Sequence, residues 1–272
     1  MTKSGALSSR RDQGHDMARI FVSGSSTGLG LMAGKLLVEQ GHQVVLHARN
    51  EARAADARKA LPEAGHAVTG DLSVVSEMKN VAEQVNKLGR FDAVIHNAGV
   101  GYQERSIKTA DGLPHVFAIN TLAPYVLTAL IERPKRLVYL SSGMHRGAAA
   151  NLQDLTWTKR SWSGSQAYAE SKLHDVLLAF AMARRWTGIL SNALEPGWVA
   201  TRMGGRGASD DLDQGHRTQV WLAVSDDPGA RVTGEYFYHL RRREPNAETR
   251  DEALQEELIE ACQRISGVAL PG

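Results

Sequence analysis

The sequence predicts an α/β fold, a single domain in which a parallel sheet of about seven strands carries helices on both faces. Two observations lead to this prediction. Short β-branched or apolar runs alternate with longer helical patterns along the chain. No apolar run approaches the ~18 residues that a membrane span needs. Because this alternation favours right-handed crossovers between parallel strands, we expect a doubly wound, Rossmann-like sheet with its ligand crevice at the carboxyl ends of the strands.

The elements follow one another in the order that such a sheet requires. Strands are expected at 19–23, 43–48, 66–69, 92–96, 136–141 and 189–195, with an edge strand at 235–239. Helices are expected at 31–40, where Gly41 is a good stop, from about Val74, and at 248–265. The helix that runs through Leu130 is short, because Arg133-Pro134 soon follows it. Residues 203–215, rich in Gly and Asp, are expected to form a mobile loop over the crevice.

Composition narrows the function classes. The chain has 272 residues, of which 42% are hydrophobic, and a formal net charge of +2. Its basic and acidic residues are interleaved, which argues against a nucleic-acid partner or an anionic membrane surface. The single cysteine, Cys262, excludes an internal disulfide and fits a reducing, cytoplasmic compartment. No set of His, Cys and Asp has metal-ligand spacing, so no metal is expected.

The N-terminus is expected to differ from the rest of the chain. Residues 1–16 are polar and lack the apolar centre of a secretion signal. We expect them to be a disordered leader, with Met17 as a conceivable alternative start, and residues 17–272 to form the folded domain.

A glycine turn follows the first strand. The segment Gly24-Ser25-Ser26-Thr27-Gly28-Leu29-Gly30 leads from that strand into a helix. Gly24 permits a tight turn, Gly28 lets the backbone approach a pyrophosphate, and Gly30 allows the helix to pack closely on the strand. The first N–H groups of the helix would then meet the anion. The spacing is not the common G-x-G-x-x-G, and an ordinary glycine-rich connection is the alternative.

Tyr168 and Lys172 lie four residues apart, which places them on one face of a helix. A phenol in water ionises near pH ~10, and a nearby ammonium favours phenolate, which brings proton exchange toward neutral pH. The pair can therefore serve as a general acid or base. The same spacing is also common on surface helices, where the ring packs and the ammonium is solvated.

Further motifs follow the later strands in a recognisable order. They are Asn97-Ala98-Gly99, Asn120, Ser141-Ser142 and Pro196-Gly197. Together with the glycine turn and the Tyr168–Lys172 pair, they resemble the short-chain dehydrogenase/reductase family, from about Arg19 to the end of the chain. Segments 141–146, 171–173 and 233–237 are most similar to its retinol-dehydrogenase-like branch.

The resemblance implies a nicotinamide cofactor. Enzymes of this fold that use NAD usually carry an acidic residue after the second strand, where this chain has Arg49. A guanidinium can pair with a 2′-phosphate, so Arg49, assisted by Asn50, implies NADP(H); a solvated arginine at a strand end is the alternative. Asp71 matches a position that binds the adenine amine, or it caps the helix near Val74. The residues implied to hold the cofactor are Gly24, Ser26, Gly28, Leu29, Gly30, Arg49, Asn50, Asp71, Leu72, Asn97, Ala98, Gly99, Tyr168, Lys172, Pro196, Gly197, Val199 and Thr201.

The resemblance also implies four catalytic residues. Tyr168 would donate a proton in carbonyl reduction and accept one in alcohol oxidation, while Lys172 would favour the phenolate and hold the nicotinamide ribose. Ser142, rather than Ser141, would orient the carbonyl oxygen. Asn120 would fix a helix distortion and a water that links Lys172 to solvent. Ser142 as a turn residue, and Asn120 as an N-cap or a core amide, are the alternatives.

Two features depart from the family pattern, and the role of one histidine stays open. The insert at 151–166 carries Trp157 and Trp162, which either line the substrate site or pack the insert on the fold. The short helix through Leu130 is where the family usually dimerises, so a monomer and a homodimer both remain open. His145 lies near the catalytic serine, where it is either structural or a substrate contact.

We therefore expect an oxidoreductase that transfers a hydride between NADP(H) and a small-molecule ketone, aldehyde or secondary alcohol of moderately apolar character. A catalytically silent NADP-sensing protein of the same fold is the alternative, although the intact Tyr168–Lys172 pair argues against it. A sugar-nucleotide epimerase fits poorly, because no sizeable substrate domain follows Pro196. The substrate depends on the loop at 100–105, the insert and the 203–215 loop, so the sequence does not name it.

Overall fold

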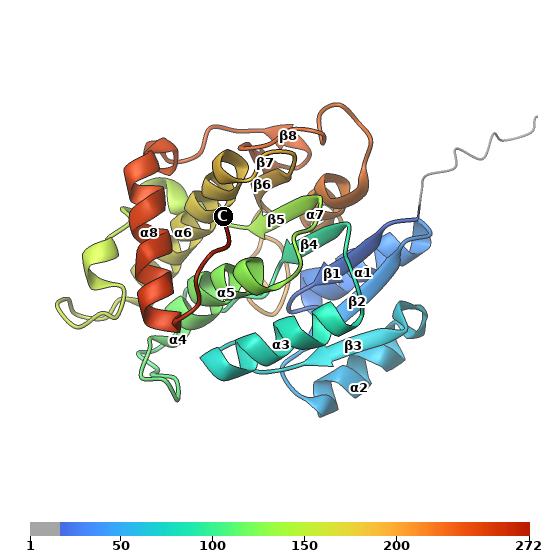
Figure 1. Ribbon diagram of the computed structural model, residues 1–272, viewed down its shortest axis with the longest axis horizontal. Helices are drawn as coiled ribbons and strands as arrows, with labels where there is room; N and C mark the ends of the chain where they lie inside the picture. Colours follow the sequence, from blue (N-terminus) through green and yellow to red (C-terminus); the bar gives the residue numbers. More distant parts are fainter. Residues whose placement is uncertain (1–16) are drawn as a thin grey trace, which may run out of the picture.

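The structure, a computed structural model, describes residues 17–272 and arranges its strands in one eight-stranded sheet (Figure 1). The predicted leader, residues 1–16, lies outside the described residues. The strands are β1 (Arg19–Val22), β2 (Gln43–Ala48), β3 (His66–Thr69), β4 (Ala93–His96), β5 (Arg136–Leu140), β6 (Leu190–Glu195), β7 (Tyr236–Tyr238) and β8 (Arg241–Arg242). The predicted strands are therefore all present, within one or two residues of their expected ends.

The sheet has the order β3-β2-β1-β4-β5-β6-β7-β8, and β1 to β7 all run parallel. The predicted doubly wound α/β fold is confirmed. The expectation that 235–239 forms the edge is wrong, because β8 pairs antiparallel with β7 beyond it. His239 and Leu240 adopt φ angles of 45° and 65°, which turn the chain back on itself. Left-handed conformations at residues other than glycine are rarely evident from sequence.

Seven helices of eight or more residues cover the two faces of the sheet in the described part of the chain. One face carries α3 (Val75–Lys87), α5 (Ala123–Leu130), α6 (Gly164–Arg185) and α8 (Glu252–Ser266), and the other carries α1 (Gly28–Glu39), α2 (Glu51–Ala60) and α7 (Gln214–Val224). Shorter helical segments are η1 (Pro62–Ala64), α4 (His115–Phe117), η2 (Ala118–Leu122), η3 (Gly143–Gly147), η4 (Leu152–Asp154) and η5 (Ala247–Arg250). On one face α3 contacts α5 and α6 contacts α8, and on the other α1 contacts α7.

Two separate cores result from the alternation of side chains along each strand. Phe21 of β1 and Val45 of β2 point into the core beneath α3, α5, α6 and α8. Ile20 and Val22 point into the opposite core, beneath α1 and α7. All four are buried, which is why the strands appear in the sequence as nearly continuous apolar runs.

Local signals set several of the helix ends. Gly41, at a φ angle of 85°, follows α1, as expected from the sequence. The Asn50 side chain accepts a hydrogen bond from the Arg53 amide and caps α2. The predicted helix at 248–265 divides in two, because Asp251 caps α8 by accepting hydrogen bonds from the amides of Ala253 and Leu254 after the separate turn η5.

The chain covers its own short helix α5. This helix ends at Leu130, as predicted, and the Tyr125 hydroxyl donates to the Val268 carbonyl in the C-terminal segment at 2.8 Å. The Trp186 indole nitrogen donates to the Pro271 carbonyl at 3.1 Å. The face of α5 is therefore packed against α8 and the last residues of the same chain. Between residues 17 and 272, no helix combines the length and the apolar character that a bilayer crossing requires.

Candidate active site

The glycine turn after β1 is built around two close backbone approaches. A Cβ atom on Gly24, which has a φ angle of 62°, would lie 2.6 Å from the Ala98 Cα atom. A Cβ atom on Gly30 would lie 2.6 Å from the Gly24 carbonyl oxygen and 2.4 Å from the side-chain nitrogen Nδ2 of Asn97. Gly28, at a φ angle of 59°, instead faces open space: apart from its chain neighbours and the backbone of its own helix, no atom of residues 17–272 lies within 4 Å of the position of its Cβ. The turn thus holds α1 against the end of β4 and leaves the backbone at Gly28 accessible.

The N-terminus of α1 is free to receive an anion. The Thr27 side chain makes no capping hydrogen bond, and no acidic residue lies in the first turn. The first N–H groups of a helix have no partner within it, and they carry the positive end of the helix dipole. The open backbone at Gly28 and these N–H groups fit a pyrophosphate.

His47, which lies in β2 and contacts this turn, is a residue that the sequence reasoning missed. Its Nδ1 atom accepts a hydrogen bond from the Gly24 amide at 2.9 Å, so Nε2 carries the proton and donates to the Gly70 carbonyl at 3.0 Å. Burial lowers the pKa of His47 to about 4, so the ring is neutral at neutral pH. The side chain therefore connects the glycine turn to the end of β3.

The residues expected near the adenosine lie at the carboxyl ends of β2 and β3. Arg49 is exposed directly after β2. The Asn50 oxygen is engaged in capping α2. The Asp71 carboxylate accepts from the Ser73 amide at 2.9 Å, and it does not cap α3. That alternative is wrong because Asp111, from a distant loop, accepts the hydrogen bond of the Val75 amide at 2.8 Å.

Helix α6 presents Tyr168 and Lys172 side by side, with the Lys172 Nζ atom 5.9 Å from the centroid of the Tyr168 ring. The Nζ atom donates to the Leu140 carbonyl at 2.7 Å and to the Asp175 carboxylate at 2.8 Å. Burial disfavours the ammonium, but Asp175 and Tyr168 together outweigh this effect, and the pKa of Lys172 is raised. Burial also raises the pKa of Asp175, against the opposing pull of the lysine.

Asn120 lies in the π-helical turn η2. Its side chain accepts from the Val100 amide at 2.8 Å and donates to the Val100 carbonyl at 3.1 Å and the Ser171 hydroxyl at 3.0 Å. The predicted helix distortion is present, and the N-cap alternative is wrong because η2 continues directly into α5. A Cβ atom on Gly99 would lie 3.4 Å from the Asn120 oxygen and 3.6 Å from the Lys172 Nζ atom, so the three residues adjoin.

A cavity of about 820 Å³ opens beside Tyr168, at the carboxyl ends of β5 and β6. Both Ser142 and Tyr168 line it. The Ser141 hydroxyl donates to the Lys172 carbonyl at 2.7 Å, which leaves Ser142 as the serine available to a ligand. The other predicted residues that line this cavity are Leu29, Pro196, Gly197, Val199 and Thr201. The predicted residues that do not line it are Gly24, Ser26, Gly28, Gly30, Arg49, Asn50, Asp71, Leu72, Asn97, Ala98, Gly99, Asn120 and Lys172.

The glycine turn, the Tyr168–Lys172 pair on α6 and the cavity beside them agree with the family that sequence comparison identifies. A family model for short chain dehydrogenases matches residues 18–211. The chain belongs to the short-chain dehydrogenase family. The protein is an oxidoreductase of this family. It is 46% identical over 263 residues to an uncharacterized oxidoreductase of Emericella nidulans, with 94% of this chain and 100% of that protein covered.

Two further relatives support the same assignment. Human retinol dehydrogenase 13 is 28% identical over 286 residues, with 93% of this chain and 85% of that protein covered, so the similarity to the retinol-dehydrogenase-like branch is confirmed. A crystal structure of an uncharacterized protein from Mycobacterium paratuberculosis superposes with a TM-score of 0.79 at 26% identity, covering 94% of this chain and 95% of that one.

The insert of this short-chain dehydrogenase packs on the fold. The rings of Trp157 and Trp162 contact each other edge to face, with their centroids 5.1 Å apart, and the Trp162 indole donates to the Glu104 carbonyl. Neither ring lines the large cavity. Of the two alternatives, the structure supports packing of the insert on the fold, because Asn151 and Arg160 of the insert bind Glu170 on α6.

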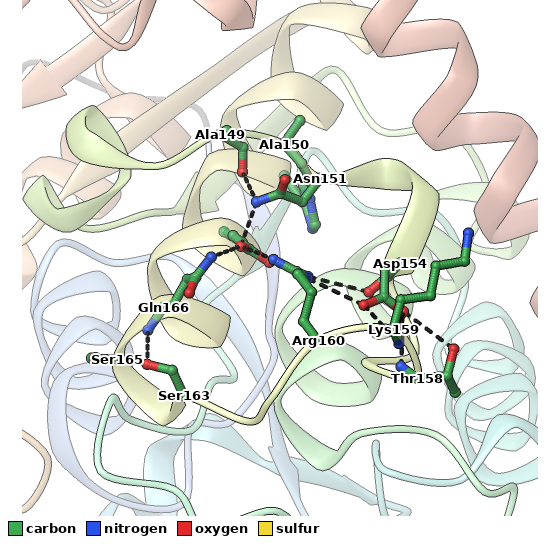
Figure 2. A network of polar contacts seen from close by, with 12 residues as sticks. Ala149, Ala150, Asn151, Asp154, Thr158, Lys159, Arg160, Ser163, Ser165 and Gln166 are labelled. Carbon is green, nitrogen blue, oxygen red and sulfur yellow. Dashed lines mark hydrogen bonds and ion pairs between the residues drawn. The ribbon is translucent and has the colours of Figure 1, made fainter.

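A polar network fastens the insert to α6 (Figure 2). The Arg160 guanidinium donates to the Asp154 carboxylate at 3.1 Å and to the Glu170 carboxylate at 2.6 Å. Asn151 and Gln166 donate to the same oxygen of Glu170 at 2.6 and 2.9 Å. Asp154 and Glu170 are both buried, so each carboxylate depends on these donors. The network holds the helix turn that carries Tyr168.

The segment after β6 forms one wall of the cavity. Trp198 is 49% exposed, and its indole nitrogen donates to the Gly204 carbonyl at 2.9 Å. The Asp210 carboxylate accepts from the Trp198 amide at 2.7 Å. Across the cavity, Met203 packs on Gly101, where an added Cβ atom would lie 2.8 Å from the Met203 Cγ atom. The predicted loop ends earlier than expected, because α7 already begins at Gln214.

Several residues around the cavity have contacts that spacing along the chain does not reveal. His145 is buried, donating to the Ser142 carbonyl and accepting from the Asn246 amide, so it is structural. Arg146 donates to the Glu195 carboxylate at 2.5 Å. Tyr102, Met203, Gly204 and Asp210 line the cavity from the two loops, 100–105 and 203–215, that were expected to shape the substrate pocket. The other lining residues that were not among the predicted site residues are Ser141, Gly143, Met144, Arg146, Glu195, Trp198, Tyr238, Arg243 and Glu244. Their contacts are between distant segments, which spacing along the chain cannot reveal.

Proposed function

We propose that this protein transfers a hydride between NADP(H) and a ketone, aldehyde or secondary alcohol. The observation that carries the proposal is the joint presence of Ser142 and Tyr168 on one cavity, with Lys172 directly behind the phenol. The cavity wall includes Met144, Met203 and other apolar or aromatic side chains. This supports a moderately apolar substrate.

Each side chain of the group has a defined part in the proposed reaction. When bound, the nicotinamide supplies or receives the hydride. The Ser142 hydroxyl donates a hydrogen bond to the carbonyl oxygen and orients it, while the Tyr168 hydroxyl donates the proton as negative charge develops on that oxygen. Lys172 supplies positive charge beside the phenol. Asn120 holds the segment at Val100, and a water at its side is proposed to return a proton to Lys172.

The residues of the turn and the strand ends would hold the dinucleotide. Gly24, Gly28 and the N–H groups at the start of α1 suit the pyrophosphate, and Asp71 suits the adenine. Lys172 suits the nicotinamide ribose, and Thr201 suits the carboxamide. The positions support this arrangement because Gly24, Asp71 and Thr201 follow the carboxyl ends of β1, β3 and β6, where ligands of this fold bind. Lys172 of α6 reaches the same edge of the sheet, since its Nζ atom donates to the carbonyl of Leu140 at the end of β5.

Arg49→Asp is expected to change the cofactor preference. Arg49 is exposed at the end of β2, where its guanidinium can pair with the 2′-phosphate of NADP(H). Replacing the guanidinium with a carboxylate should lower kcat/KM with NADPH by at least tenfold. The ratio of kcat/KM with NADH to kcat/KM with NADPH should therefore rise. The ratio of the two kcat/KM values measures the effect. Arg53→Asp on the first turn of α2 is the control, and an unchanged ratio in Arg49→Asp would refute the assignment.

Gly30→Ala is expected to weaken dinucleotide binding. The new methyl group would meet the Asn97 side chain and the Gly24 carbonyl, so α1 must shift from the end of β4. Overpacking of this kind costs about 1–3 kcal/mol. If this strain destabilises only the cofactor-bound state, the NADP+ dissociation constant should rise roughly tenfold or more. Gly147→Ala, where an added methyl group meets no atom, is the matched control. Equal affinity in both variants, measured by calorimetry, would contradict the role of Gly30.

The direct test of the function follows NADPH absorbance with a panel of aliphatic, aromatic, steroid and retinoid carbonyls. Oxidation of NADPH with any member supports the proposal. Tight NADP+ binding with no turnover on any member would favour the NADP-sensing alternative.

We also propose that the protein is cytoplasmic and monomeric. The monomer is proposed because α8 and the C-terminal segment cover α5, the helix at which the family usually dimerises.

A further inference from the structure

Asp175 is a buried acid that touches the proposed catalytic lysine. It lies three residues after Lys172 on α6, one helical turn farther from Tyr168. The Lys172 Nζ atom donates to its Oδ2 atom at 2.8 Å, and both side chains are almost completely buried. Within residues 17–272, Asp175 is the one carboxylate that contacts this lysine. In the alkaline range the carboxylate is ionised, because its pKa is raised only to about 7, and it provides the acceptor that an ammonium at this distance needs.

The ion pair with Asp175 weakens the electrostatic effect of Lys172 on the Tyr168 phenol. A lone buried ammonium would favour phenolate strongly, because charge interactions are weakly screened in the interior. An ammonium paired with a carboxylate carries little net charge, and its effect on a group beyond the pair is correspondingly smaller. We propose that Asp175 is a positioning residue that holds Lys172 and offsets its charge, so that Tyr168 keeps its proton to higher pH than a lone lysine would allow.

The remaining titratable groups around the pair carry no net charge that could replace this effect. Burial raises the pKa of Tyr139 on β5 and of Tyr236 on β7, so both stay neutral, and Tyr102 stacks edge to face on Tyr168. Burial lowers the pKa of His96 on β4 to about 3, of His145 in η3 to about 4, and of His174 on α6, so these rings are neutral as well. The charges of Arg146 and Glu195 cancel within their own ion pair.

The inference rests on the proposed function, since it concerns the proton that Tyr168 would donate. It predicts that carbonyl reduction persists into the alkaline range. Removing the carboxylate should make the phenol easier to ionise, because the charge of Lys172 would then act on it alone. At an effective dielectric of about 20, loss of one nearby charge corresponds to a shift of about one pH unit.

The experiment compares Asp175→Asn with the wild-type full-length chain. The amide keeps an oxygen acceptor for Lys172 and removes the charge. The alkaline midpoint of kcat/KM for NADPH-dependent reduction is expected to fall by about one pH unit, and the onset of alcohol oxidation to fall with it. An unchanged midpoint, or a midpoint that rises, would overturn the inference. Absence of turnover in the wild type would instead refute the proposed function.

Glu170→Gln is the matched control. Glu170 is also a buried acid of α6 in an ion pair, but its partner is Arg160 of the insert. This variant is expected to lose stability and to keep the wild-type pH midpoint. If both variants shift the midpoint equally, the effect is a general loss of charge from α6 and the inference fails.

A measurement on the wild type tests the inference even if Asp175→Asn does not fold. Near-ultraviolet absorbance reports tyrosinate, and subtraction of the Tyr168→Phe titration isolates the step that belongs to Tyr168. We expect this step to lie above neutral pH, because Asp175 offsets the charge of Lys172. A step near neutral pH would mean that Lys172 acts as an uncompensated charge, which would overturn the inference.

Discussion

Tyr168→Phe is expected to lower kcat for carbonyl reduction by about 10²- to 10⁴-fold, the range typical of losing a positioned general acid. The phenol lines the cavity together with Ser142, and its hydroxyl is the proposed proton donor. Phenylalanine fills the same space and keeps the edge-to-face contact with Tyr102. The NADP+ dissociation constant should therefore change little. Steady-state kinetics and calorimetry on the same preparations measure the two quantities.

Tyr125→Phe provides the control for removing a phenolic hydroxyl from this fold. Tyr125 is more deeply buried than Tyr168. Its hydroxyl contacts the C-terminal segment and not the cavity. This variant should lose stability by about 1 kcal/mol and retain turnover. Near-native turnover in Tyr168→Phe would show that another group donates the proton, and the proposed mechanism would be wrong.

The free energy of unfolding is expected to fall steeply as the pH drops from about 6.5 to about 4. His47 and His145 have pKa values lowered to about 4 by burial, and His96 to about 3. In this window the unfolded chain binds protons that the folded rings exclude, so stability is fully present above the unfolded value of about 6.5 and is lost below it. His47 has a structural reason to stay neutral, since its Nδ1 atom must accept from Gly24.

The slope of the unfolding free energy against pH follows from the number of protons that unfolding takes up. Each histidine contributes about 1.4 kcal/mol per pH unit within the window. Asp175 acts in the opposite direction, because its raised pKa lets the folded state hold a proton that the unfolded chain releases. Burial also lowers the pKa values of His174 and His216, which add to the loss of stability, so the net slope is at least about two protons, or about 3 kcal/mol per pH unit. Urea unfolding at a series of pH values measures this slope.

His47→Gln gives the corresponding check. Glutamine offers an oxygen to the Gly24 amide and does not titrate, so the slope should decrease by about one proton relative to the wild type. Stability that is constant or rises between pH 6.5 and 5 would contradict the assignment of these histidines as neutral and buried.

The fold could be predicted because its signals are local. Each parallel strand is buried on both faces, so it appears as an apolar run, and Gly41 and Asn50 carry the conformations and caps that begin or end helices. The β7–β8 turn escaped prediction because its left-handed residues, His239 and Leu240, carry no glycine or asparagine signal.

The candidate site was only partly visible in the sequence. Tyr168 and Lys172 share a helix, so their spacing alone predicts their proximity. Asp175, on the same helix, could have been found by the same argument, since residues three apart are neighbours. The Trp157–Trp162 pair shows the limit of such reasoning, because an aromatic residue serves a cavity wall and a packed insert equally well.

By itself, the sequence determined the order of strands and helices, the glycine turn and the residues that share one helix face, since all of these depend on neighbours along the chain. Only the tertiary structure decided that the insert packs away from the cavity, that His47 supports the turn and that Arg146 pairs with Glu195. The physical reason is that these contacts join segments far apart in the chain, where geometry and burial, rather than spacing, select the partner.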